Sequence, residues 1–245
     1  MRARIGGARE RHRGLVLLVV AGVTFGSAAT GYAASLALAS QKLTVFRTCM
    51  LTATPSSTTA VSDTYVSLGG GNPSKNFGTD TTMFVNTGSS QNRRIYISFD
   101  LTRCSPSIPA TTTVSIAVLR TYVTVLPTVC RTQDIFRVTG SWTETGITWN
   151  NQPFGTSSNN PPSGQRTDSI DVGAAPCQNS TTGAYVSGWD VATDVQAFVS
   201  GTATNYGWMI RDDVESSSTT RTSTYTTKDA NVLARAPQLV VVYEE

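Results

Sequence analysis

The stretch RRIYISFDL, residues 93–101, carries the clearest structural signal in the sequence. From Ile95 to Leu101 every second residue is large and apolar, while the residues between them carry polar groups. Successive side chains of a β-strand point to opposite faces of a sheet. The alternation therefore predicts a strand with one face in a hydrophobic core.

Comparable patterns lie on both sides of this stretch. Residues 114–126 (VSIAVLRTYVTVL) predict one long strand, and residues 193–200 have the apolar spacing of a short helix. Further strands are predicted at 62–68, 83–87, 134–138, 146–149, 169–172, 184–189, 205–211, 222–227 and 238–243. About ten short strands, without helices alternating between them, predict one all-β domain, either a sandwich or a barrel.

The composition supports an all-β protein and excludes several kinds of catalysis. Charged residues make up 14% of the 245 residues, whereas about 25% is typical of soluble domains. Ser and Thr together account for about a quarter of the chain, which disfavours a helical bundle or a coiled coil. The only histidine is His12. The chain beyond it therefore has no imidazole for Ser-His-Asp, Cys-His or zinc-hydrolase chemistry.

The first 39 residues have the features of a membrane-targeting element. Five arginines and His12 precede an uncharged stretch that runs from Leu15 to Ala39. A basic start, a short apolar run and an Ala-x-Ala site at 37–39 are typical of a cleaved secretory signal. A retained anchor helix is the alternative, because about 20 apolar residues suffice to span a bilayer. Either interpretation places the rest of the chain outside the cytoplasm.

We therefore expect three parts. Residues 1–39 are predicted to be a signal peptide or membrane anchor, residues 40–61 a Ser/Thr-rich linker, and residues 62–245 the β domain. The leader and the excess of arginine, 16 against 3 lysines, favour a bacterial protein that is secreted or held at the cell surface. Without residues 1–39 the chain has 14 basic and 15 acidic residues. Because no basic stripe is present, we expect no nucleic-acid partner. We also expect the protein to be a monomer.

The four cysteines predict disulfides in an oxidising compartment. Four cysteines allow three pairings, and the sequence alone does not choose among them. The pairing Cys104–Cys130 is favoured because the segment between them is predicted to be one long strand with a turn at each end, which leaves Cys49–Cys177. Metal binding by the cysteines is disfavoured, because no C-x-x-C spacing occurs.

A series of short motifs runs through the predicted domain. The motifs are DTYV (63–66), NFG (76–78), RRIYISFDL (93–101), SWTE (141–144), TWNNQP (148–153), WDV (189–191), NYGW (205–208) and PQLVV (237–241). In order and spacing they resemble carbohydrate-binding module family 96, also called the DNRLRE domain, over about residues 62–243. The resemblance implies a jelly-roll-like antiparallel β-sandwich without catalytic activity. It also implies an extracellular polysaccharide or a cell-wall glycan as the ligand.

Four side chains are candidates for binding the glycan. Trp208 and Tyr206 carry aromatic faces that match the C–H face of a sugar ring. Arg94 and Arg211 carry guanidinium groups that can form two parallel hydrogen bonds to a carboxylate. The alternatives remain open, because a tryptophan is often a core residue and Arg94 could instead pair with a carboxylate such as Glu144.

The acidic residues allow two further interpretations. Oxygen-rich groups bind Ca²⁺, so Asp63, Asp212 and Asp213 are candidate ligands of a structural calcium ion, although no Dx[DN]xDG loop is present. Solvated surface acids are the alternative. Paired carboxylates can also hydrolyse glycosides across a cleft. We expect no enzymatic activity, and we keep two alternatives to glycan binding: a structural or adhesive surface domain, and a small lyase or hydrolase that uses Asp212, Asp213 or Glu144.

Overall fold

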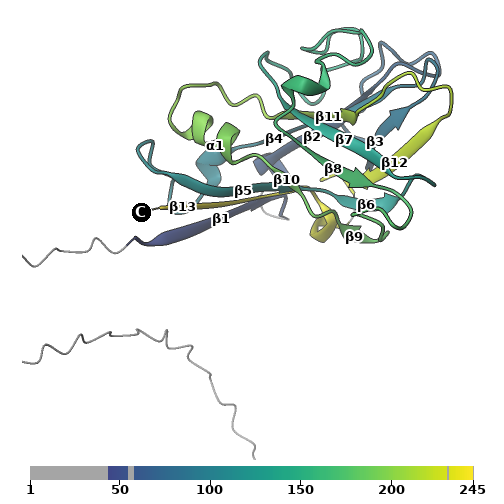
Figure 1. Ribbon diagram of the computed structural model, residues 1–245. Helices are drawn as coiled ribbons and strands as arrows, with labels where there is room; N and C mark the ends of the chain where they lie inside the picture. The colour runs from purple at the N-terminus through teal and green to yellow at the C-terminus, as the bar shows by residue number, and fades with distance from the viewer. Residues whose placement is uncertain (1–43, 55–57, 231, 245) are drawn as a thin grey trace, which may run out of the picture. The chain divides into compact units, whose positions relative to one another are not determined.

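Two antiparallel β-sheets pack face to face in the computed structural model, which describes residues 44–54, 58–230 and 232–244 (Figure 1). This confirms the predicted all-β sandwich. The predicted signal peptide or anchor at residues 1–39 lies outside the described residues. Within the described ranges, no helix is long and apolar enough to cross a membrane.

Thirteen strands and one α-helix make up the regular structure of the described residues. They are β1 (Phe46–Thr52), β2 (Val61–Ser67), β3 (Thr82–Thr87), β4 (Arg93–Phe99), β5 (Val114–Arg120), β6 (Tyr122–Val125), β7 (Arg131–Arg137), β8 (Asp168–Val172), β9 (Ala184–Tyr185), β10 (Trp189–Asp190), α1 (Ala192–Val199), β11 (Trp208–Asp212), β12 (Arg221–Thr226) and β13 (Gln238–Glu244).

The smaller sheet has four strands in the order β1-β13-β5-β10. The larger sheet has nine, in the order β8-β7-β11-β4-β3-β12-β6-β9, with β2 paired to β4. The main core lies between the sheets and contains Ile95, Ile97 and Phe99 of β4, all at most 2% exposed. The alternation in residues 93–101 therefore predicted the strand and its buried face correctly.

Four strand and linker predictions were wrong in detail. Residues 184–189 belong to two strands in different sheets, β9 and β10. Residues 114–126 form two strands in different sheets, β5 and β6, because the chain changes sheet at the buried Thr121. Residues 146–149 form a turn instead of a strand. The predicted linker at 40–61 contains β1, which pairs with β13 along its length. The sequence did not reveal β1 as a strand, because only two of its residues, Cys49 and Leu51, are buried. The residues around them are threonines or exposed side chains.

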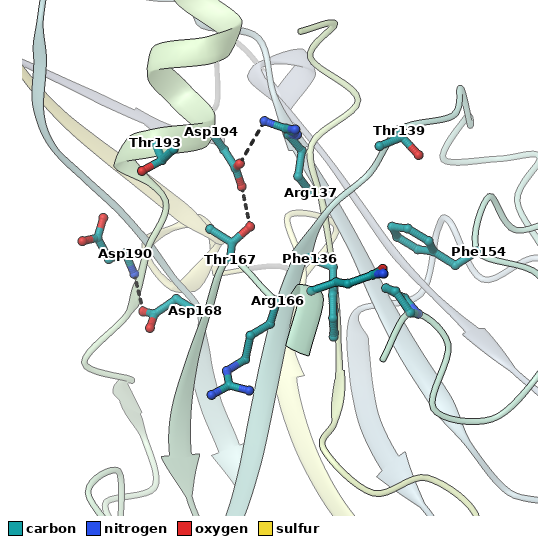
Figure 2. A pocket seen from close by; sticks show the side chains of 12 residues that line it. Phe136, Arg137, Thr139, Phe154, Arg166, Thr167, Asp168, Asp190, Thr193 and Asp194 are labelled. Carbon is teal, nitrogen blue, oxygen red and sulfur yellow. Dashed lines mark hydrogen bonds and ion pairs between the residues drawn. The ribbon is translucent and has the colours of Figure 1, made fainter. Parts of the chain in front are cut away.

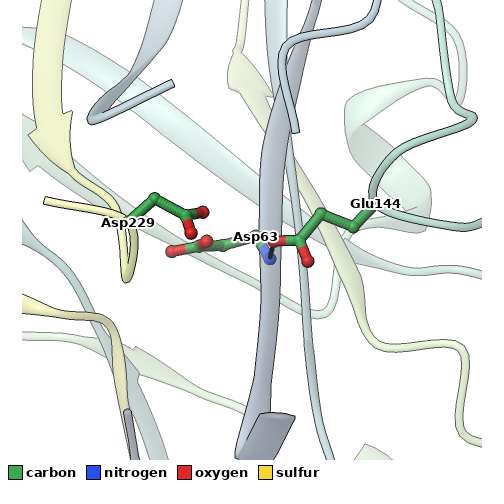
Figure 3. Close-up of side chains that lie close together, drawn as sticks. All are labelled: Asp63, Glu144 and Asp229. Carbon is green, nitrogen blue, oxygen red and sulfur yellow. Dashed lines mark hydrogen bonds between the residues drawn. The ribbon is translucent and has the colours of Figure 1, made fainter. Parts of the chain in front are cut away.

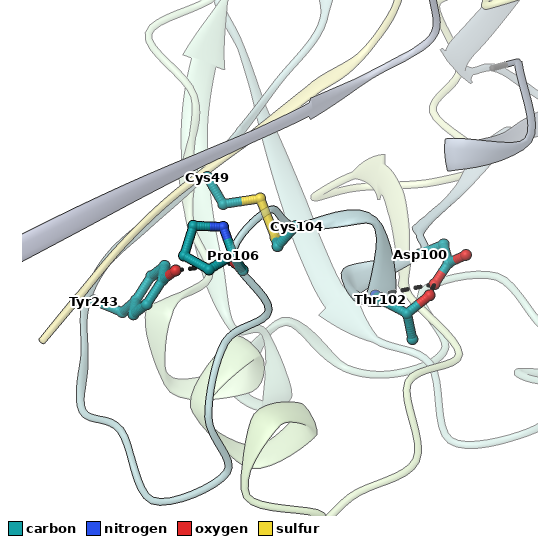
Figure 4. The surroundings of a disulfide bond; sticks show 6 residues. All are labelled: Cys49, Asp100, Thr102, Cys104, Pro106 and Tyr243. Carbon is teal, nitrogen blue, oxygen red and sulfur yellow. Dashed lines mark hydrogen bonds between the residues drawn. A yellow bond between two sulfur atoms is a disulfide. The ribbon is translucent and has the colours of Figure 1, made fainter. Parts of the chain in front are cut away.

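The disulfides are Cys49–Cys104 (Figure 4) and Cys130–Cys177, so the favoured pairing was wrong. That pairing assumed one strand between Cys104 and Cys130. The register Arg131↔Val172 of β7 and β8 instead brings the chain next to Cys130 close to the segment that holds Cys177. Cys49 faces inward from β1 and meets Cys104, which follows the end of β4. In the chain-entropy model, each bridge stabilises the fold by roughly 4 kcal/mol.

The outer face of the nine-stranded sheet carries a second hydrophobic core. Residues 139–167, which connect β7 to β8 and are called the cover segment below, lie across this face. Ile147 and Trp149 of the cover segment pack there on Tyr96, Phe136 and Met209 of the sheet. Because Met209 pairs with both Tyr96 and Phe136 in the strand register, these side chains form one row across β4, β11 and β7.

The outer face of the four-stranded sheet is different. Met50, Val240 and Val118 are cross-strand neighbours on it, and so are Val242 and Ile116. Met50 is 57% exposed and Ile116 50% exposed. This face is therefore apolar but open to solvent.

Candidate functional site

Arg94 is buried beneath the cover segment. All five of its N–H donors are used. The Nε and Nη2 atoms donate to the two carboxylate oxygens of Glu215 at 2.8 and 2.7 Å, and the remaining donors bond to Gln152 Oε1 and to the carbonyl oxygens of Gly155 and Ser157. Both ionic side chains are 0% exposed. Arg94 thus holds the cover segment on the sheet, and this placement argues against direct contact with a glycan.

Arg211 has a similar position. Its Nη2 atom donates to the carbonyl oxygen of Pro161 at 2.7 Å, and Nη1 donates to the carbonyl oxygens of Asp212 and Asp213. The guanidinium group lies 4.9 Å from the centre of the Phe136 ring. The side chain is fully buried. It therefore connects the end of β11 to the cover segment and presents no surface to a ligand.

Of the four tryptophans, three are buried. Trp208 lies in the main core, 1% exposed, and its Nε1–H donates to Asp194 Oδ2 at 2.9 Å. Trp149 and Trp189 are equally buried. Trp142 is only half-buried. The core interpretation thus describes Trp208 better than the stacking interpretation does.

Trp142 and Tyr206 form a small aromatic surface. Trp142 Nε1–H donates to the backbone oxygen of Tyr206 at 2.8 Å, and the ring of Trp142 packs edge-on against Tyr96. Trp142 lines two grooves of about 270 and 240 Å³, and Tyr206 lines the second. Tyr206 is therefore the one of the four predicted ligand-binding residues that the structure places beside an accessible groove.

A larger cleft lies where the cover segment meets α1. Its volume is about 630 Å³. Its lining comes from four parts of the chain: the end of β7, the cover segment, the start of β8, and the stretch from β10 into the first turn of α1 (Figure 2). The residues that line it are Phe136, Arg137, Thr139, Phe154, Pro161, Gln165, Arg166, Thr167, Asp168, Asp190, Thr193 and Asp194.

Ion pairs and hydrogen bonds hold the wall of the cleft in place. Asp194 accepts from Arg137 Nη1 at 3.3 Å and from Thr167 Oγ1 at 2.7 Å (Figure 2). It also accepts from Trp208. Asp168 Oδ2 accepts the backbone N–H of Asp190 at 2.7 Å. These contacts fix the carboxylates at the α1 side of the cleft.

The cleft keeps both charged and apolar groups at its surface. The side chains of Arg137 and Arg166 are 37% and 43% exposed. Arg166 Nη1 donates to the carbonyl oxygen of Ser163, and its Nε lies 3.7 Å from Asp134. Phe154 and Pro161 supply apolar surface. Hydrogen-bonding groups around a partly apolar concavity are the usual lining of a site for a small polar ligand.

The sequence did not identify this cleft. Only the fold brings its charged residues together. Four of them are ordinary surface residues of separate segments, namely Arg137, Arg166, Asp168 and Asp190, and the fifth, Asp194, is buried. The one available signal was the density of Asn, Pro, Gly and Ser in residues 150–167, which indicated a long loop. Long loops on a rigid scaffold often carry binding sites.

The acidic candidates for calcium fall into two groups. Asp212 and Asp213 both accept from Arg131, so each carboxylate already has a guanidinium partner. Asp63 lies instead with Glu144 and Asp229, and one carboxylate oxygen from each lies within 4.8 Å of the others (Figure 3). Burial raises the pKa of Asp63 from 3.8 to about 8.

A sequence model of carbohydrate-binding module family 96 matches residues 54–243. The chain belongs to this family. The matched region of the family 96 chain holds β2 to β13 and begins after β1 and Cys49. No curated protein matches the chain.

Proposed function

We propose that this family 96 chain is a non-catalytic carbohydrate-binding module that binds an extracellular or cell-wall polysaccharide in the cleft between the cover segment and α1. The observation that carries the proposal is the lining of this cleft. Partly exposed guanidinium groups of Arg137 and Arg166 line the same cleft as the carboxylates of Asp168 and Asp190 and the apolar surface of Phe154. Sugar hydroxyl groups can bond to both kinds of charged group, and the apolar surface can meet a C–H face.

Several features support a site of action outside the cytoplasm. Two disulfides and a carbohydrate-binding family are typical of extracellular proteins. The basic and apolar leader in residues 1–39 fits export. We further propose a jelly-roll topology for the sandwich, a monomer as the binding unit, and no role for nucleic acid. If the leader stays uncleaved, it connects the module to the membrane.

Glycan arrays and affinity gels with the purified chain test the proposal. Arg166→Gln should weaken glycan binding at least about tenfold, because a hydrogen bond to a charged group contributes about 1.5–3 kcal/mol. Thr139→Phe should also weaken glycan binding at least about tenfold, because the larger side chain narrows the cleft from an exposed position. Arg103→Ala is the matched control, since Arg103 is 51% exposed and does not line the cleft.

A second variant separates the cleft from the aromatic surface. Trp142→Ala should leave binding unchanged if the glycan occupies the cleft. If Trp142→Ala abolishes binding while Arg166→Gln and Thr139→Phe do not, the site lies at Trp142 and Tyr206, and the proposed cleft is wrong.

A structural or adhesive surface domain is the alternative function. The observation that favours it is the burial of three of the four tryptophans, which leaves a small aromatic surface. Failure of the chain to bind any neutral or acidic polysaccharide, together with surface attachment that survives both Trp142→Ala and Arg166→Gln, would support this alternative.

A further inference from the structure

Three segments that are distant in sequence bring carboxylates together at one edge of the nine-stranded sheet. Asp63 belongs to β2, Glu144 to the cover segment, and Asp229 follows β12 (Figure 3). Two hydrogen bonds fix the position of Glu144. Its Oε1 accepts the backbone N–H of Asp63 at 2.9 Å, and its carbonyl oxygen accepts from Asn76 Nδ2 at 2.8 Å.

One oxygen of this cluster has no partner. Asp63 is 1% exposed, and its Oδ2 accepts the backbone N–H of Lys228 at 2.8 Å. Its Oδ1 is buried and has no hydrogen-bond donor among the described residues. A buried carboxylate oxygen without a donor or a cation is unfavourable. A proton or a bound cation would relieve this cost, so the carboxyl group of Asp63 can take up a cation.

The cluster already holds one positive charge. Lys228 Nζ lies 2.9 Å from Glu144 Oε1 and 2.9 Å from Asp229 Oδ2, and the lysine side chain is 9% exposed. This ammonium group marks a place where the protein binds a cation. One ammonium group faces three carboxyl groups, so the cluster has fewer positive than negative charges when all are ionised.

We propose that Asp63, Glu144 and Asp229 form a Ca²⁺ site, in which the Lys228 ammonium group takes the place of the ion when calcium is absent. Ca²⁺ accepts carboxylate oxygens in flexible geometry and tolerates water ligands. Asp229 is partly exposed, which leaves a side of the cluster open to water. Zinc and copper favour histidine or cysteine ligands, and the described part of the chain has no histidine and no free cysteine.

Calcium at this position would connect three parts of the molecule. It would join β2, the cover segment and the segment after β12 through one ion. The proposed site is separate from the glycan cleft, since none of its three carboxylates lines that cleft. Glu144 does line the smaller groove beside Trp142 and Tyr206. A failure to bind calcium would therefore not by itself disprove glycan binding in the cleft.

The test is a titration of the full chain with CaCl₂ after treatment with a chelator, followed by calorimetry and by thermal unfolding. We expect saturable binding and a rise in Tm. Lys228→Met removes the competing ammonium group and should tighten Ca²⁺ binding about tenfold or more. Asp63→Asn and Asp229→Asn should each lose the response. Asp213→Asn, which removes an acid paired with Arg131, is the matched control and should keep it.

Two results would overturn the proposal. One is the absence of any calcium response in both the unmodified chain and Lys228→Met. The other is a response that persists in Asp229→Asn, whose side chain is 31% exposed and can be replaced without disturbing the core. Far-UV circular dichroism shows whether each variant is folded.

Discussion

The two outer faces of this sandwich are made of similar strands, but one face is buried and the other is exposed to solvent. On the nine-stranded sheet, the row through Tyr96, Met209 and Phe136 is completely buried beneath the cover segment. On the four-stranded sheet, Met50 and Ile116 are half or more exposed. Apolar side chains thus occur on both outer faces, and the difference comes from the polar groups that hold the cover segment in place.

Those polar groups are the buried arginines of the nine-stranded sheet. Arg94 and Arg211 of the nine-stranded sheet bond to backbone oxygens of residues 155, 157 and 161 in the cover segment. Backbone carbonyls of a long loop need donors when they are buried, and a guanidinium group supplies five donors in a fixed arrangement. Covering the face therefore uses the arginines for structure and moves the candidate binding site to the margin of the cover segment.

Among the substitutions considered, replacing Arg94 should lower the free energy of unfolding the most. Arg94→Met leaves Glu215 buried without its cation, and the loss of one partner of a buried pair costs about 3–5 kcal/mol. Urea denaturation measures the change in the free energy of unfolding. Arg103→Met, at an exposed ion pair, should cost less than about 1 kcal/mol. A loss for Arg94→Met no greater than that for Arg103→Met would contradict the role assigned to Arg94.

A pair of methionines compares the two faces directly. Met209→Ala, at a position 0% exposed, should cost about 2–5 kcal/mol because it leaves a cavity under the cover segment. Met50→Ala, at a position 57% exposed on the other face, should change stability by less than about 0.5 kcal/mol. The loss of stability caused by the same Met→Ala substitution thus measures how deeply each face is buried. Similar costs at both positions would mean that the two outer faces do not differ as described.

The pH dependence of stability gives a smaller effect on the covered face. Asp134 is 1% exposed, its carboxylate oxygens have no hydrogen-bond donor within the described residues, and the nearest guanidinium groups are those of Arg166 at 3.7 Å and Arg211 at 4.0 Å. Burial raises the pKa of Asp134 above its ordinary value of 3.8. The folded state therefore binds this proton more tightly than the unfolded state does.

The tighter binding of this proton adds to the free energy of unfolding. The contribution is fully present below pH 3.8 and is lost as the pH rises through the raised pKa. The slope contributed by one such group is at most about 1.4 kcal/mol per pH unit. Asp134→Asn should flatten the pH profile in this window, as measured by urea denaturation at several pH values. An unchanged profile in Asp134→Asn would show that this carboxyl group is not held in its neutral form.

The main core could be predicted from the sequence, because strand alternation is a local property. Ile95, Ile97 and Phe99 identify their own buried face without reference to any other segment. The disulfide pairing and the split of residues 114–126 were missed for the opposite reason. Each depends on which sheet a strand joins, and that choice is made by distant partners such as β13 for β5 and β12 for β6.

The candidate site shows the same limit more strongly. Arg94 and Arg211 have the residue type of ligand-binding groups, but the sequence does not show that residues 139–167 fold back over them. The cleft residues Arg137, Arg166 and Asp190 have no pattern in common along the chain. Their meeting depends on where the cover segment ends against α1.

The most direct test of this account is a map of the glycan on the protein by NMR. Amide chemical shifts would be followed while the chain is titrated with the glycan that binds best on an array. If the glycan occupies the cleft, shifts will cluster at the margin of the cover segment, at Thr139, Gln165, Arg166 and Asp190. No shifts are expected at Met50 or Ile116 on the open sheet face. Shifts confined to Trp142 and Tyr206, or to the open face of the four-stranded sheet, would contradict glycan binding in the cleft.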